Sequence, residues 1–86
     1  MTPEEKELVT IQVINYLKEH DWTCLNLTQT ELGVPDYICF RDKRYFFLYV
    51  ANELSDEQID WQKDKGYMQV AWVNSLQEIQ EGNRYI

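Results

Sequence analysis

The sequence predicts an α/β fold: a helix, three strands, a second helix and a fourth strand, with a short helix at the C-terminal end. Three observations predict it. Apolar residues at helical spacing open the chain, two apolar and aromatic runs flank a short polar turn at 41–44, and a well-capped helix separates the second run from a further one. A strand-helix-strand unit favours a parallel crossover, so the four-stranded sheet is expected to be mixed.

The first helix is predicted over residues 3–19. Thr2 is a favoured N-cap residue, and a proline follows it at the first helical position. Glu5, three residues after the cap, completes the pattern of a capping box. Apolar residues then recur at helical spacing from Val9 to Leu17, which indicates one buried helix face.

Strands are predicted at 22–27, 36–40, 45–51 and 67–73. The second and third are joined by a tight hairpin of polar residues. The third strand is apolar at successive positions, which is typical of an inner strand that is covered on both faces.

The second helix has the clearest start signal in the chain. Ser55 is its predicted N-cap and Gln58 the capping-box partner, and Gly66 fits just beyond its C-terminal end. Ser75 is predicted to begin a last short helix that stops before Gly82. With no repeat or linker in the sequence, we expect one domain over residues 1–82 and a short tail at 83–86.

Composition limits the classes of partner. The 86 residues include 15 acidic and 8 basic side chains, a net charge of −7, which disfavours a protein that grips phosphates over a broad surface. A local basic cluster of Arg41, Lys43 and Arg44 is the candidate nucleic-acid-binding site; the alternative is ordinary hairpin charges. Cys24 and Cys39 are expected to be small buried thiols, and a disulfide would require their strands to be neighbours. The chain shows no signal peptide and no apolar run of membrane-spanning length, so a cytoplasmic location without membrane contact is expected.

An acidic column is predicted on the second helix. Asp56, Asp60 and Asp64 follow one another at four-residue spacing and therefore share a helix face. Two interpretations remain open. The column is either a solvated helix face or a partner-binding surface for a basic protein, such as one that binds nucleic acid.

Several features occur in an order that points to a family. They are the segment Gly33–Asp36, the aromatic strand that ends at Val50, Ser55 followed by Gln58 and Trp61, and Gly66 before the last strand. In this order they resemble the virus-type replication-repair nuclease (VRR-NUC) domain of the PD-(D/E)XK superfamily, over most of the chain. The resemblance implies that fold, a phage-type origin, metal-dependent cleavage of DNA in active members, and pairing as homodimers.

The resemblance also assigns active-site positions. It implies that Asp36 is a metal ligand, and that a glutamate and a lysine stand at positions 49 and 51; this chain has Tyr49 and Ala51 there. A glutamate of the first helix would fall at Thr10, or at Glu7 if the alignment slips by one turn. One carboxylate alone binds magnesium weakly, and a phenol is neutral near pH 7. The site is therefore expected to be degenerate.

Two functions follow as expectations. The first is a catalytically degenerate nuclease-like protein that needs no cofactor and binds a protein partner, such as a nucleic-acid enzyme or a defence nuclease, or structured DNA. The alternative is an active endonuclease on branched or flapped DNA, with Mg or Mn held by Asp36 and a migrated carboxylate at Glu53, and with Gln58 in support. Each residue also has a structural interpretation: Asp36 at the strand entry, Glu53 in solvent and Gln58 as a helix cap.

Overall fold

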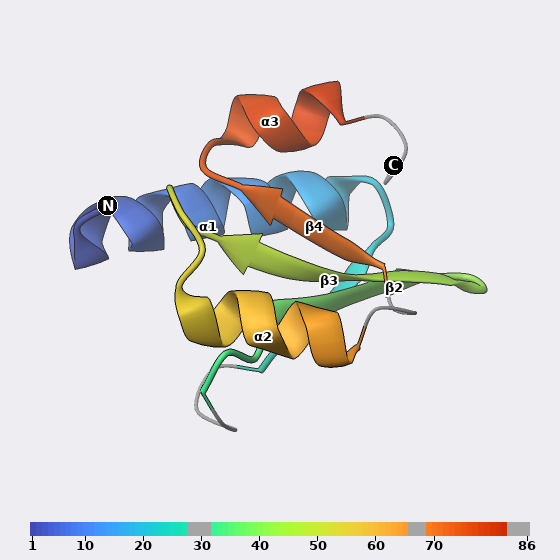
Figure 1. Ribbon diagram of the computed structural model, residues 1–86. Helices are drawn as coiled ribbons and strands as arrows, with labels where there is room; N and C mark the ends of the chain where they lie inside the picture. The colour runs from blue at the N-terminus through green and yellow to red at the C-terminus, as the bar shows by residue number, and fades with distance from the viewer. Residues whose placement is uncertain (28–31, 66–68, 83–86) are drawn as a thin grey trace.

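The computed structural model describes residues 1–27, 32–65 and 69–82 (Figure 1). Within them the chain forms an α/β fold with a four-stranded mixed sheet and three helices, as predicted. The elements are α1 (Pro3–Glu19), β1 (Thr23–Asn26), β2 (Tyr37–Arg41), β3 (Arg44–Val50), α2 (Asp56–Asp64), β4 (Val70–Val73) and α3 (Leu76–Glu81). The predicted positions of Gly66, of the first residues of the last strand and of the 83–86 tail lie outside the described residues.

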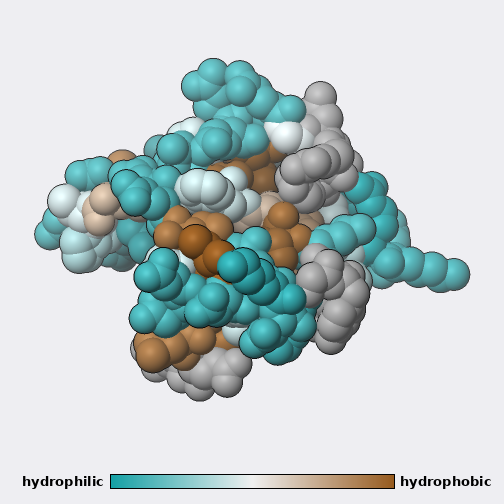
Figure 2. Space-filling model, viewed as in Figure 1, coloured by the Kyte–Doolittle hydropathy of each residue, from teal (hydrophilic) through white to brown (hydrophobic). Residues whose placement is uncertain are grey.

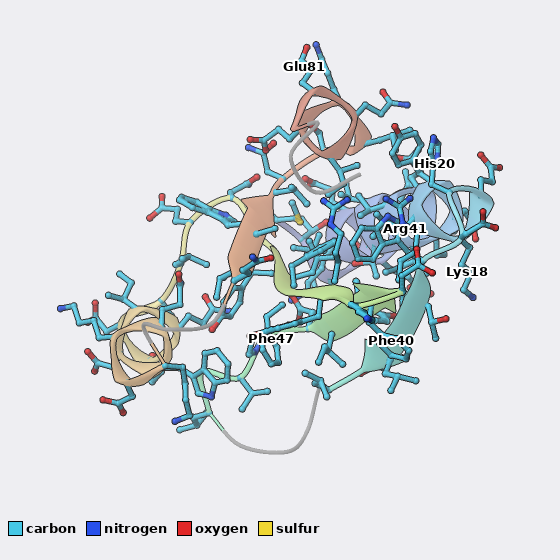
Figure 3. All side chains as sticks on the ribbon, turned by 90° about the vertical axis from the view of Figure 1, so that its right-hand side faces the viewer. Lys18, His20, Phe40, Arg41, Phe47 and Glu81 are labelled. Carbon is cyan, nitrogen blue, oxygen red and sulfur yellow. The ribbon has the colours of Figure 1, made fainter. Side chains whose placement is uncertain are left out.

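The sheet has the strand order β1-β2-β3-β4. β2 pairs with β1 and with β3 in antiparallel orientation, whereas β3 pairs with β4 in parallel, which confirms the expected mixed sheet. Helices α1 and α3 pack on one face of the sheet, whereas α2 lies on the other side (Figures 1 and 3).

The main core lies between the sheet and the pair α1 and α3. Its members alternate along each strand, as the pleat of a sheet requires. They include Leu17 from α1, Phe46, Leu48 and Val50 from β3, and Ile79 from α3, all nearly or fully buried. Because Tyr49 falls between Leu48 and Val50, it is buried on the opposite face, toward α2.

The helix starts follow the local signals. The Thr2 hydroxyl accepts a hydrogen bond from the Glu5 amide at 3.1 Å, and Ser75 caps α3 in the same way. At α2 the capping box is complete: the Gln58 amide donates to the Ser55 hydroxyl at 3.2 Å, and the Ser55 amide donates to the Gln58 side chain at 2.8 Å. These bonds satisfy amide groups that the first turn of a helix leaves unpaired.

Strand boundaries differ slightly from the predicted ranges. β3 ends at Val50, although the Ala51 amide still donates to the Val73 carbonyl at 3.0 Å. Residues 51–53 then form a bend, so Glu53 lies beyond the end of the strand that carries Tyr49. Among the described residues, no helix has the length and apolar character needed to cross a membrane.

Candidate functional site

Asp36 is a buried carboxylate with both oxygens engaged. It stands just before β2 with only 6% of its surface exposed. Its Oδ1 accepts a hydrogen bond from the ammonium group of Lys6 on α1 at 2.9 Å, and its Oδ2 accepts one from the Val50 amide of β3 at 2.8 Å. The side chain therefore ties α1 and β3 to the entry of β2, because its two partners lie 30 and 14 residues away in the sequence.

The segment before Asp36 has the conformation that its residue types favour. Gly33 has a φ of 83°, in the left-handed region that glycine adopts without strain. A side chain at this position would also overlap the backbone carbonyl of Glu57 in α2. Pro35 is fully buried and restricts the backbone ahead of β2. The glycine thus allows α2 to approach this segment closely.

Tyr49 joins the same segment to the sheet. It is fully buried, and its hydroxyl donates a hydrogen bond to the Gly33 carbonyl at 2.6 Å, with the Gln58 carbonyl of α2 farther away at 3.4 Å. Burial, and secondly the negative charge of Asp36, raises the pKa of Tyr49 to about 12. At neutral pH the phenol is therefore an uncharged donor that holds the loop, and not an anionic ligand.

The remaining predicted site residues have structural partners or lie in solvent. The Ala51 carbonyl accepts a hydrogen bond from the Trp72 indole at 2.7 Å. The side chain of Gln58 belongs to the capping box, which confirms that interpretation. Glu53 is exposed and, with Lys6 and Gln58, lines an open hollow of about 540 Å³.

Lys6 was missed in the sequence. It lies four residues before Thr10, the position assigned to the glutamate of the first helix, so both residues fall on nearly the same helix face. Its position one helical turn from an expected carboxylate is the sequence feature that could have indicated a site residue. The tertiary fold is needed to show that its ammonium group reaches Asp36.

The donors at this site suit a divalent cation poorly. They amount to one carboxylate already bound to Lys6 and to the Val50 amide, and one neutral phenol, since the methyl group of Ala51 has no ligand atom. Magnesium requires several oxygen ligands in near-octahedral geometry. Within the described ranges there is also no group of three side chains suited to hold a metal ion. A cation that bound Asp36 would have to compete with the ammonium group of Lys6 for the carboxylate.

The basic cluster of the hairpin packs on the protein itself. The guanidinium group of Arg41 donates to the His20 carbonyl at 2.8 Å and lies 4.7 Å from the centre of the Trp22 ring (Figure 3). Arg44 lies 5.9 Å from the same ring centre. Lys43 is exposed at the turn. The structure thus brings two of the three residues together as a cover for Trp22, on the α1 face of the sheet.

The acidic column is exposed along α2. Asp56, Asp60 and Asp64 all reach solvent, and the outer side of α2 is hydrophilic (Figure 2). Asp60 and Asp64 line a second open hollow, of about 460 Å³, whose apolar members are Leu32 and Trp61. The column is therefore adjacent to apolar surface and not only to water.

Comparison with known proteins does not assign the chain to a family. No family model matches the chain, and neither the curated proteins nor the solved structures include a match. The resemblance to VRR-NUC domains consequently stays a prediction from the residues.

Proposed function

We propose that this chain is a catalytically degenerate nuclease-like domain that acts by binding a protein partner. The observation that supports the proposal best is the ion pair between Lys6 and Asp36. In the nucleases that the sequence resembles, the corresponding aspartate would bind a metal. Here a side chain of the protein supplies the positive charge, at 2.9 Å from the carboxylate.

Tyr49 supports the same conclusion. At this position the resemblance implies a carboxylate, but the neutral hydroxyl of Tyr49 donates a hydrogen bond to the Gly33 carbonyl. Phosphodiester hydrolysis by metal-dependent nucleases needs a cation to activate water and to stabilise developing negative charge. In the described structure, Asp36 and Tyr49 are instead engaged in hydrogen bonds with the protein itself, to Lys6, the Val50 amide and the Gly33 carbonyl. This arrangement favours a structural role over metal binding.

A cleavage assay tests the proposal. The purified chain is incubated with single-stranded, duplex, flapped and four-way-junction DNA in Mg²⁺ or Mn²⁺, beside an Asp36→Ala variant as the contamination control. We expect no cleavage above the control. Cleavage by the native chain that disappears in the variant would overturn the proposal.

Metal binding provides a second measurement that does not depend on activity. Paramagnetic Mn²⁺ broadens NMR signals close to its binding site. We expect no selective broadening of the Asp36 and Val50 amides at low Mn²⁺ concentration. Selective broadening there, removed by Asp36→Ala, would show that the ion binds at Asp36 and would contradict the proposal.

The alternative is an active endonuclease on branched or flapped DNA. One observation favours it: Glu53 and Lys6 line the same hollow, next to Asp36. In this case Mg²⁺ or Mn²⁺ would be held by Asp36 and Glu53, with Gln58 nearby. Glu53→Ala would then abolish cleavage while leaving the fold intact, since the side chain is exposed.

A further inference from the structure

The sheet face opposite α1 and α3 has an apolar surface, which among the described elements α2 covers only at one end (Figure 3). The register places Leu25 beside Ile38 and Ile38 beside Phe47, and in the next row Phe40 beside Tyr45. Leu25 is 52% exposed, Phe40 38% and Tyr45 39%. Phe40 and Phe47 lie on this side of the sheet in Figure 3. A run of exposed apolar side chains on one sheet face is typical of an interaction surface.

This surface continues to the hollow beside α2. The rings of Tyr45 and Phe47 are 6.0 Å apart, and the rings of Phe47 and Trp61 are 5.4 Å apart. Trp61 lines the hollow together with Leu32, which is 84% exposed. We name this continuous surface the apolar track; its members are Leu25, Leu32, Ile38, Phe40, Tyr45, Phe47 and Trp61.

One side of the apolar track is acidic. Glu57, Asp60 and Asp64 line the hollow in which Leu32 and Trp61 lie. Lys65 lines it too, with its ammonium group 5.6 Å from the centre of the Trp61 ring, so three acidic side chains stand against this one basic side chain in the lining. The chain as a whole carries a net charge of −7. Negative charge at the track therefore favours a cationic occupant and repels both phosphates and a second copy of this chain.

We propose that the apolar track docks a basic amphipathic segment of a partner protein, with apolar side chains on the track and Lys or Arg side chains against the acidic residues of α2. The proposal rests on the proposed binding function and specifies the chemistry of the partner. Apolar contacts would provide most of the affinity, and the charges would select among partners and speed association.

Nucleic acid is the less favoured occupant. Bases could stack on the exposed aromatic rings, but their phosphates would then lie near the acidic residues of α2. Arg41 and Arg44 lie on the opposite face, over Trp22, and so do not flank the track.

The first test compares peptides of equal charge. The probe is a fluorescent synthetic helix with Leu on one face and Lys on the other, and its partner peptide has Ser at each Leu position. We expect the Leu-Lys peptide to bind the native chain about tenfold more tightly at physiological salt. Equal binding of the two peptides, or no binding of either, would overturn the proposal.

Charge-reversal variants then locate the acidic contribution. We expect the double substitution Asp60→Lys and Asp64→Lys to weaken binding of the Leu-Lys peptide about tenfold. The matched control, Glu7→Lys with Glu19→Lys, makes the same change of net charge on α1, where both residues are exposed. The control should change binding less than about twofold. An equal loss in both variants would show attraction to net charge alone and refute the assignment.

A second pair of variants locates the apolar contribution. Leu25→Ser removes an exposed track residue, and Leu8→Ser removes a residue of α1 that is similarly exposed, at 58%. Only Leu25→Ser should weaken peptide binding, with both variants folded by circular dichroism. Competition by a single-stranded DNA oligomer, or a dimer in sedimentation that Leu25→Ser dissociates, would assign the track to a different occupant and overturn the proposal.

These outcomes are separate from those of the cleavage assay. A chain that cleaves DNA and also discriminates between the peptides would refute the proposed function and leave the docking surface supported. A chain that does neither would refute the docking surface alone.

Discussion

Replacing Tyr49 by Phe should make the stability difference between the two proteins depend on pH. The substitution keeps the ring and removes one hydroxyl, whose hydrogen bond to the Gly33 carbonyl is 2.6 Å long. A neutral hydrogen bond of this kind contributes about 1 kcal/mol. At pH 7 the native chain should therefore be more stable than the variant by about 1 kcal/mol.

The sign of this difference should change at alkaline pH. The pKa of Tyr49 is raised from 10.0 to about 12 in the folded chain, so the folded state keeps its proton where the unfolded state releases it. That contribution to stability is complete below pH 10 and is lost as the pH rises toward 12. At pH 11 the loss is about 1.4 kcal/mol, which exceeds the contribution of the hydrogen bond. Tyr49→Phe, which cannot ionise, should then be the more stable protein.

The assay is urea denaturation of both proteins, followed by circular dichroism, at several values between pH 7 and pH 11. The exposed Tyr45 provides the control, because Tyr45→Phe removes a hydroxyl from a ring that is 39% exposed. We expect little change with pH for the control. A constant difference between native chain and Tyr49→Phe from pH 7 to pH 11 would refute the assignment of Tyr49 as a buried neutral donor.

Three further predictions concern the site and the sheet. Gly33→Ala should destabilise the fold by about 2 kcal/mol or more in urea denaturation, since Gly33 has a positive φ and no space for a side chain. An unchanged urea midpoint would contradict the close approach of α2. Lys6→Met should lower the free energy of unfolding by about 1–2 kcal/mol, a value reduced by the 42% exposure of Lys6. Adding Asp36→Asn to it should recover part of this loss, whereas additive losses would argue against the ion pair. Cys24 and Cys39 lie directly opposite each other on β1 and β2 as free thiols, so oxidised glutathione should link them within one chain and be reduced to two molecules of glutathione. The mass of the chain should fall by two hydrogen atoms, whereas glutathione adducts alone would contradict this register.

The element order could be predicted because its signals are local. The Ser55–Gln58 capping box and the Thr2 cap act within one helical turn, and both form in the structure with the residues that the sequence predicts. The hairpin at 41–44 likewise requires only its own residues, with Asp42 in the left-handed conformation that aspartate tolerates. Such short-range interactions determine where helices and strands begin.

The candidate site depended on contacts between distant segments. Lys6 and Asp36 are 30 residues apart, and no local rule pairs a helix lysine with a strand-entry carboxylate. The same holds for Arg41, whose guanidinium group packs over Trp22 of another segment of the chain. The sequence by itself determined which elements form and which positions lack the expected carboxylate and lysine. Only the tertiary structure decided what neutralises Asp36, because a charge buried by the fold must find its partner among the groups that packing brings within reach.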